Sequence, residues 1–182
     1  MKSIRFFLPA IFLSTLSWGA VGYSRFSHPK GDYVVDYPAD WKQSIGLQSL
    51  RLRPSGKETY RTKVSIERYP LSKGDPPTAK QFIEKLLDKS TGLKKLEARK
   101  TVKVSGRDAE RLEFVETKTL KGAYDQPLPG PLREIYIVIP LQHAYYLLRL
   151  ESIADAYVKT QPEFEKIAEK FQLRKDADSI IP

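Results

Sequence analysis

The chain has 182 residues and no cysteine, so we expect neither disulfide bonds nor a lipid-modified N-terminal cysteine. Its 31 Lys and Arg residues outnumber its 22 Asp and Glu residues, which gives a formal net charge of +9. In a cytosolic protein, this positive charge would first suggest nucleic-acid binding. An exported protein instead meets anionic lipids, acidic glycans or acidic proteins.

The first 22 residues are typical of a secretory signal peptide. A basic start at residues 1–5 precedes an apolar run at residues 6–16 that is too short to span a bilayer. We expect cleavage before Tyr23, with Ala20 as the alternative first residue. Removal of residues 1–22 takes away two basic residues and no acidic one, which lowers the net charge from +9 to +7. The sequence therefore predicts a single exported domain at residues 23–182, with no nucleic-acid partner.

Three strands are predicted in the first half of this domain. Tyr33–Tyr37 is rich in β-branched and aromatic residues, and Pro38–Asp40 supplies a turn before Trp41. We expect the Trp41 ring to be buried beneath the edge of a sheet. Leu50–Arg53 and Lys63–Tyr69 follow as two further strands. Short turns between these strands favour an antiparallel meander.

A helix and a hairpin are predicted next. Thr78 and Gln81 match a capping box, and a helix from there to about Ser90 carries apolar residues at helical spacing. Leu96–Val104 and Asp108–Thr117 then alternate as strands around Ser105-Gly106-Arg107, where glycine permits a positive φ. The helix should cover a sheet to which this hairpin belongs.

The last part of the chain begins with residues 118–131, whose glycines and prolines predict a long loop. Leu132–Pro140 and Ala144–Glu151 are the most apolar segments and should form the central hairpin, covered on both faces. Thr160 and Glu163 match a second capping box, at the start of a closing helix with a proline in its first turn. Together these elements predict an α+β domain in which two helices cover an antiparallel sheet.

The order of these elements carries a family resemblance. Together with the phrase Tyr33-Val-Val-Asp-Tyr-Pro-Ala-Asp-Trp41, it resembles the PsbP-like family, which is related in fold to the Ran-binding Mog proteins. The hairpin around residues 135–139 and 145–148, Tyr157 and the closing helix at residues 164–171 extend the resemblance over most of the domain. It implies an α/β/α sandwich that acts as a non-enzymatic binding or assembly module.

The resemblance also implies possible settings for such a module. Plant and cyanobacterial members sit on the lumenal side of photosystem II and stabilise its manganese and calcium site. This chain has neither the lipid-modified cysteine typical of cyanobacterial members nor the longer transit sequence of plant members. We therefore expect an exported bacterial relative in the periplasm or outside the cell, or in the thylakoid lumen if the source is photosynthetic.

The residues themselves indicate no catalytic site. The chain has no cysteine and only two histidines, and His143 falls in a predicted turn. Glu110 and Glu116 share one side of a strand while Glu113 points to the other, so no acid and base pair is formed locally. We therefore predict that the protein is not an enzyme and that it has no cofactor.

A divalent metal is the one cofactor that the sequence leaves open. His28, Asp32 and Asp36 recur at a spacing of four residues, but an extended strand does not bring such residues together as a helix would. We therefore predict no metal site.

Basic residues on two strands are the candidate partner-binding residues. Arg51 and Arg53 share one side of their strand, and Arg99 and Lys103 share the polar side of another. An acidic protein or an anionic membrane is the partner that they would fit. Tyr60 and Tyr69 lie among the strands, where aromatic residues more often serve packing than binding.

Three functions are compatible with these features. The leading hypothesis is a non-catalytic exported module that docks on an acidic protein or membrane. One alternative is an extrinsic subunit of photosystem II. The other is an envelope-acting hydrolase whose two carboxylates are brought together by the fold.

Overall fold

The computed structural model of the protein describes residues 22–30, 32–56, 61–71, 77–88, 94–117 and 130–174. The expected signal peptide lies outside these residues except for Gly22, and Tyr60, Ser90 and residues 118–129 of the expected loop lie outside them as well. Within the described ranges, no helix is long and apolar enough to cross a membrane.

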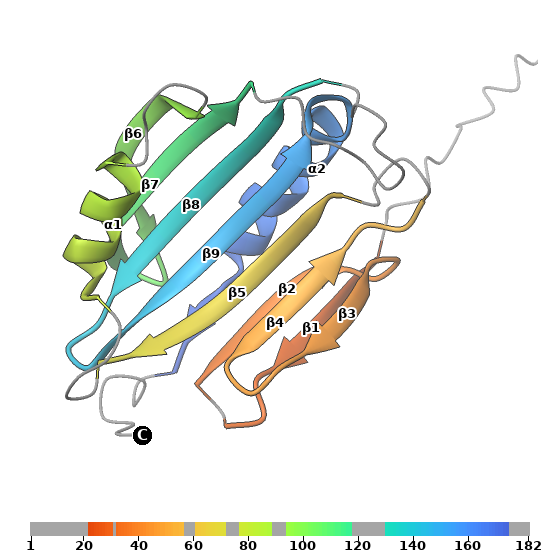
Figure 1. Cartoon of the computed structure of the whole chain (residues 1–182). Helices are drawn as coiled ribbons and strands as arrows, with labels where there is room; N and C mark the ends of the chain where they lie inside the picture. Colours follow the sequence, from red (N-terminus) through yellow and green to blue (C-terminus); the bar gives the residue numbers. More distant parts are fainter. Residues whose placement is uncertain are drawn as a thin grey trace, which may run out of the picture.

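Ten strands and two helices form the described domain (Figure 1). The strands are β1 (Tyr23–Ser27), β2 (Tyr33–Pro38), β3 (Lys42–Ile45), β4 (Ser49–Arg53), β5 (Lys63–Pro70), β6 (Lys94–Val104), β7 (Arg107–Glu116), β8 (Leu132–Pro140), β9 (Ala144–Ile153) and β10 (Gln172–Leu173). The helices are α1 (Ala79–Asp88) and α2 (Ala154–Glu169).

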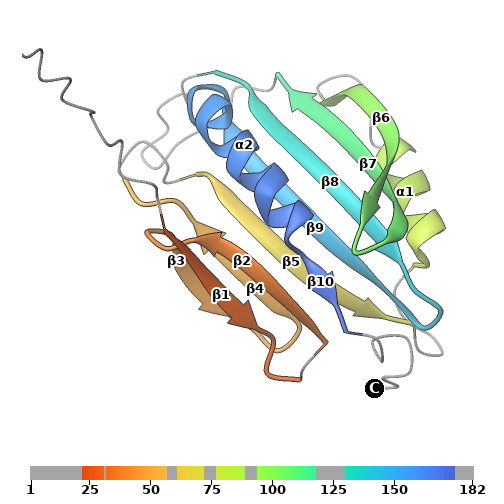
Figure 2. The same cartoon turned by 180° about the vertical axis from the view of Figure 1, so that it is seen from behind.

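These elements are arranged in layers around one large sheet. Its seven strands follow the order β3-β4-β5-β9-β8-β7-β6, and all neighbours are antiparallel. Helix α1 lies on one face, while α2 and a small sheet of order β1-β2-β10 lie on the other (Figures 1 and 2). The expected α+β architecture, an antiparallel sheet with helices on both faces, is confirmed.

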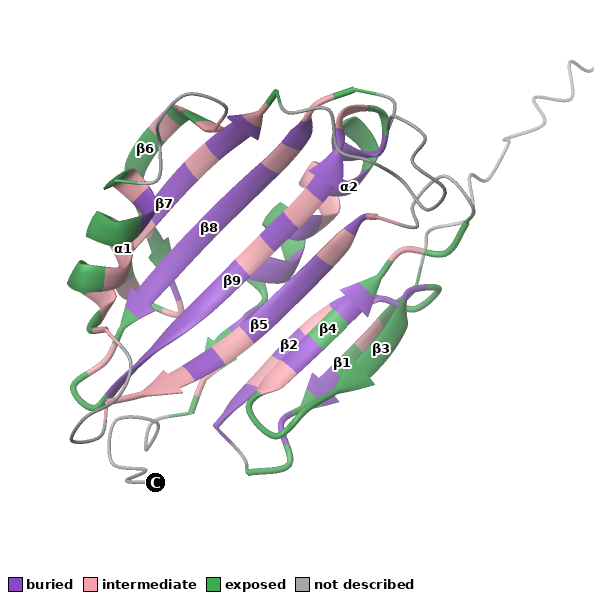
Figure 3. Cartoon of the chain, in the orientation of Figure 1, coloured by how far each residue is buried: buried purple, intermediate pink, exposed green. Residues whose placement is uncertain are grey.

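The main core lies between the large sheet and the layer of α2 and the small sheet. Alternate residues of β4, β5, β9 and β8 point into it, where they meet the α2 residues Phe164 and Ile167. A smaller apolar cluster lies under α1, around the buried Leu86. The predicted central position of β8 and β9 is correct, and most of their residues are buried (Figure 3).

Trp41 is buried as the sequence predicted, since only 8% of its surface is exposed. It follows the turn after β2, where its backbone N–H donates to the carbonyl of Pro38 at 3.0 Å. Its ring belongs to the main core together with Leu50 and Leu52 of β4. Trp41 therefore helps to join the small sheet to the edge of the large one.

Two of the expected local motifs have the predicted geometry. At the start of α1, the Thr78 N–H donates to the Gln81 side chain at 2.9 Å and the Gln81 N–H donates to the Thr78 hydroxyl at 3.3 Å, as in a capping box. In the hairpin of β6 and β7, Ser105 and Gly106 both have positive φ, 52° and 75°. Such a turn matches the twist of its strands.

The predicted start of the closing helix is wrong. Helix α2 begins at Ala154, directly after β9, and its N-cap residue Ile153 makes no side-chain capping bond. Thr160 lies inside the helix and donates its hydroxyl hydrogen to the Ala156 carbonyl at 2.8 Å, so it caps nothing. Pro162 also lies in the interior of α2. The helix tolerates this proline because the burial of its first two turns, including Ala156 and Tyr157, offsets one lost backbone bond.

Candidate binding surface

No described helix or second sheet covers one face of the large sheet over β3, β4, β5 and the C-terminal half of β9, and this open face is on the same side as α1 (Figure 1). Side chains alternate along a strand, and Leu50 and Leu52 point into the main core, so Arg51 and Arg53 point to this open face. By the same alternation and strand register, these four strands place seven charged residues on it. They are Lys42, Arg51, Arg53, Lys63, Glu67, Arg149 and Glu151. Five of the seven are basic, so the open face is positive.

Three of these cations form what we call the basic patch: Lys42, Arg51 and Arg53. Lys42 and Arg53 are register partners on β3 and β4, and all three residues are exposed. No carboxylate of the described residues lies within ion-pairing distance of any of the three. The positive charge of the basic patch is therefore not neutralised within the described part of the molecule.

Beside the basic patch lies a network of paired charges. Glu151 accepts from Lys63 at 3.2 Å and from Arg149 at 2.6 Å, while Glu134 accepts from both Arg149 and Lys94. Glu134 is only 3% exposed. Burial alone would raise the pKa of its carboxyl, but the Arg149 guanidinium and the Lys94 ammonium outweigh burial and hold this pKa below its ordinary value. This network lies at the end of the open face where β5 begins.

The network also bears on the hydrolase alternative. Glu134 and Glu151 are register partners on β8 and β9, so the fold does bring two carboxylates together. Arg149 contacts both of them. A general acid needs a raised pKa, whereas the pKa of Glu134 is lowered. This pair is therefore built as an ion-pair network and not as an acid and base pair.

The other two candidate residues lie at the opposite edge of the same face. Arg99 of β6 contacts Glu110 at 2.6 Å, and Lys103 contacts Asp108 at 2.8 Å. Arg51 and Arg99 stand in one register row across the sheet, separated by five strand spacings, about 24 Å. The structure thus brings Arg51 and Arg53 together, but separates them from Arg99 and Lys103, whose charges are paired.

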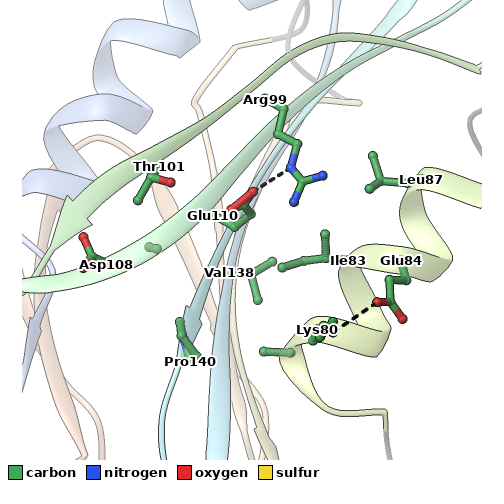
Figure 4. A pocket seen from close by; sticks show the side chains of 12 residues that line it. Lys80, Ile83, Glu84, Leu87, Arg99, Thr101, Asp108, Glu110, Val138 and Pro140 are labelled. Atoms are coloured by element: carbon green, nitrogen blue, oxygen red, sulfur yellow. Dashed lines mark hydrogen bonds and ion pairs between the residues drawn. The ribbon is translucent and has the colours of Figure 1, made fainter.

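A hollow of about 490 Å³ lies beside Arg99, between α1 and the β6–β7 hairpin (Figure 4). Apolar side chains of α1 and β8, including Ile83, Leu87 and Val138, form its floor. The Arg99–Glu110 pair lies on its strand side and the Lys80–Glu84 pair on its helix side. Both pairs are internally neutral, so this hollow lacks the unpaired charge that distinguishes the basic patch.

The three candidate metal ligands are only partly brought together. The turn between β1 and β2 places His28 Nδ1 3.6 Å from Asp32 Oδ2, and both side chains are buried. Asp36 instead accepts from Arg25 at 2.8 Å across β1 and β2. Among the described residues, no group of three His, Cys, Asp or Glu side chains is arranged to hold a metal ion. The absence of a metal site stays a prediction.

The remaining candidate side chains have ordinary positions. His143 is exposed in the turn between β8 and β9, as expected. Tyr69 packs against Tyr145, with ring centroids 4.8 Å apart and an interplanar angle of 10°. Glu110 and Glu113 contact Arg99 and Arg111 respectively, consistent with the predicted alternation.

Sequence reasoning missed one member of the basic patch and most of the network. Lys42 was not assigned because β3 has no apolar alternation, and its strand is recognisable only from its pairing with β4. Glu134 and Arg149 are charged residues within the two most apolar segments of the domain. This position in the sequence is the signal that could have identified them as members of a charge network. A charge within a buried strand requires a partner on a neighbouring strand.

Comparison with known proteins identifies the fold. No protein-family model matches the chain, and no curated protein sequence matches it. Among solved structures, cyanobacterial PsbP (CyanoP) from Synechocystis superposes with a TM-score of 0.55 at 14% identity, over 87% of this chain and 96% of that one. The Ran-binding protein Mog1p of Saccharomyces cerevisiae superposes with a TM-score of 0.53 at 11% identity, over 85% and 96%.

A third structure, from Bacteroides thetaiotaomicron, has a TM-score of 0.55 at 14% identity over 86% of this chain. This chain spans only half the length of that protein. At such identities the likeness concerns the fold, and it agrees with the resemblance seen in the sequence. The chain therefore has the fold shared by PsbP and Mog1.

Proposed function

We propose that the protein is a non-catalytic exported module that docks on an acidic protein through its basic patch. The observation that carries this proposal is the set of three neighbouring exposed cations, Lys42, Arg51 and Arg53, with no ion pair to any described residue. Like charges on adjacent strands repel one another and destabilise a sheet slightly. An acidic partner would offset this repulsion. The arrangement of the three cations therefore favours the complex with such a partner over the free protein.

The fold supports a protein as the partner. Mog1p, which shares this architecture, is a Ran-binding protein. A module of this fold can therefore bind another protein. The ion pairs around Glu134 support a non-catalytic role, since they keep this carboxyl ionised.

The N-terminal boundary of the fold supports export. The described strands begin at Tyr23, the residue expected to follow the signal-peptide cleavage. Cleavage there leaves β1 whole and pairs it with β2 along its full length. We expect mass analysis of the secreted protein to give an N-terminus at Tyr23 or Ala20. A cytosolic product that retains Met1 would contradict export.

A capture experiment with matched charge changes tests the docking surface. The exported protein, the R51E/R53E variant and the R99E/K103E variant would each be used as bait in an envelope extract of the source organism. Both variants change the net charge equally, but only R51E/R53E alters the basic patch. We expect the same acidic protein to be recovered with the wild type and with R99E/K103E, and to be lost with R51E/R53E.

Two results would contradict this proposal. One is equal recovery by all three baits. The other is binding to vesicles that contain anionic lipid in the absence of any captured protein, which would make a membrane the partner.

A further inference from the structure

We propose that the outer edge of β3 binds an extended acidic peptide of the partner as an additional strand. This inference rests on the proposed function and specifies how the partner is held. Backbone hydrogen bonds along β3 would supply affinity. Contacts of the peptide side chains with the two faces of the sheet edge would supply specificity. The relevant part of the molecule is the exposed edge of the large sheet (Figure 3).

The backbone of β3 has free groups along this edge. The Gly46 N–H donates to the Ser49 carbonyl at 2.8 Å, so Gly46 and Ser49 form a hydrogen-bonded pair. In an antiparallel ladder such pairs alternate, which makes Ser44 and Lys42 the next residues bonded to β4. The N–H and C=O groups of Gln43 and Ile45 therefore point outward, away from β4. No described backbone group pairs with these groups.

The opposite edge of the sheet differs in ways that discourage pairing. Strand β6 carries four lysines and has a register irregularity between Leu96 and Ala98. Lysines and bulges on an edge strand are devices that block the addition of another strand. Strand β3 is in regular register over its four residues and has one lysine. The two edges therefore differ in their capacity to accept a peptide.

The residues on the two sides of β3 indicate which side chains the added strand should carry. On the open face, Lys42 and Ser44 lie beside Arg53 and Arg51, so peptide residues on this side should be acidic. On the other side, Ile45 lines a hollow of about 520 Å³ between the β3–β4 turn and the β1–β2 turn. Among the described residues that line it, Lys30 is the one with a charged side chain. An apolar side chain of the peptide fits this hollow.

The apolar rim of this hollow is unusually exposed. Ile45 is 51% exposed and Leu47 is 92% exposed, although both are large aliphatic residues. Their contact with an apolar peptide side chain would remove this surface from water. Because side chains alternate along a strand, the expected ligand has acidic residues at every second position and apolar residues between them.

A peptide fits this edge better than a membrane does. The outward groups of Gln43 and Ile45 include two carbonyls as well as two amides, and the carbonyls require donors. Lipid phosphates offer acceptors but no row of amide donors at strand spacing. A peptide backbone supplies both kinds of group in alternation, as in other complexes formed by strand addition.

Synthetic peptides test this inference directly. The probe is a capped hexapeptide that alternates glutamate and valine, and its controls are the same composition with the three glutamates in one block and an N-methylated alternating peptide. Binding would be measured by fluorescence anisotropy, and hydrogen exchange would report on the Gln43 and Ile45 amides. We expect the alternating peptide to bind at least tenfold more tightly than both controls and to protect these two amides.

The protein variants separate this inference from the proposed function. We expect R51E/R53E to bind the alternating peptide at least tenfold more weakly, and R99E/K103E to bind it as the wild type does. Equal binding of all the peptides without amide protection would overturn strand addition while leaving the basic patch as an acidic docking surface. Binding of anionic vesicles but of no peptide would also overturn it. Peptide binding that R51E/R53E retains would instead contradict the proposed function.

Discussion

Trp41 shows how a single aromatic residue holds two layers together. It follows the Pro38–Asp40 turn, and its ring lies in the main core between the small sheet and β4. Truncation to alanine would remove this large buried ring from the main core. We expect Trp41→Ala to lower the free energy of unfolding by about 3 to 5 kcal/mol, measured by urea denaturation.

A matched control for this change is Leu47→Ala, which truncates a side chain exposed to water. That variant should stay within about 0.5 kcal/mol of the wild type. If Trp41→Ala cost less than about 1 kcal/mol, the Trp41 ring would have to be exposed in solution.

Glu134 makes a different contribution, which depends on pH. Its folded-state pKa is lower than the ordinary 4.5 of a glutamate, so its stabilising effect is complete above pH 4.5 and is lost as the pH falls through the folded-state value. Glu134→Gln leaves Arg149 and Lys94 without this partner. We expect it to cost about 2 to 3 kcal/mol at pH 7, less than for a fully buried pair because both cations are partly exposed.

The pH dependence distinguishes this electrostatic effect from a packing defect. The difference in free energy of unfolding between wild type and Glu134→Gln should shrink as the pH falls below 4.5, because Glu134 becomes protonated in both states. Glu97→Gln, which breaks a more exposed pair with Arg133, should cost less than about 1 kcal/mol. A difference that is constant from pH 7 to pH 3 would assign the loss to packing.

At the scale of the element, helix α2 has a proline in its interior, whereas the sequence analysis predicted this proline in the first turn of the helix. Pro162 cannot donate to the carbonyl of residue 158, and its ring is exposed. Substitution by alanine restores this backbone bond without removing a buried group. We expect Pro162→Ala to raise the free energy of unfolding by about 1 to 2 kcal/mol, less than the full cost of a helical proline because the unfolded chain also gains freedom.

Thermal denaturation of Pro162→Ala beside Gln161→Ala measures this effect. The neighbouring Gln161→Ala substitution changes no backbone donor and should move stability by less than about 0.5 kcal/mol. A destabilised Pro162→Ala protein would show that α2 depends on the distortion that this proline introduces.

The elements that sequence reasoning identified share one physical property, a strong local pattern. The capping box at Thr78, the alternation in β7 and the apolar runs of β8 and β9 each depend on neighbouring residues alone. Strands β1 and β3 were missed because their formation depends on pairing with β2 and β4, which local alternation does not reveal. The start of α2 was misplaced because burial against the sheet, and not a capping residue, determines where this helix begins.

At the scale of the whole molecule, strand order determines which charges become neighbours. Sequence alternation correctly paired Arg51 with Arg53 and Arg99 with Lys103, but the relation between the two pairs depends on the seven-strand order. That order places them at opposite edges and adds Lys42 to the first pair. The candidate surface is therefore the basic patch alone and does not include Arg99 and Lys103. Its charges lack the ion pairs that neutralise Arg99 and Lys103.

The affinity of the protein for its captured acidic partner, measured for wild type, R51E/R53E and R99E/K103E across a salt series, tests the central claim most directly. Each exposed ion pair with the partner contributes up to about 1 kcal/mol, and the introduced glutamates also repel an acidic partner, so R51E/R53E should weaken binding by at least about 30-fold. R99E/K103E should remain within about threefold of wild type, and added salt should weaken the wild type most. Equal affinities for the three proteins, or salt-insensitive binding by the wild type, would contradict docking through the basic patch.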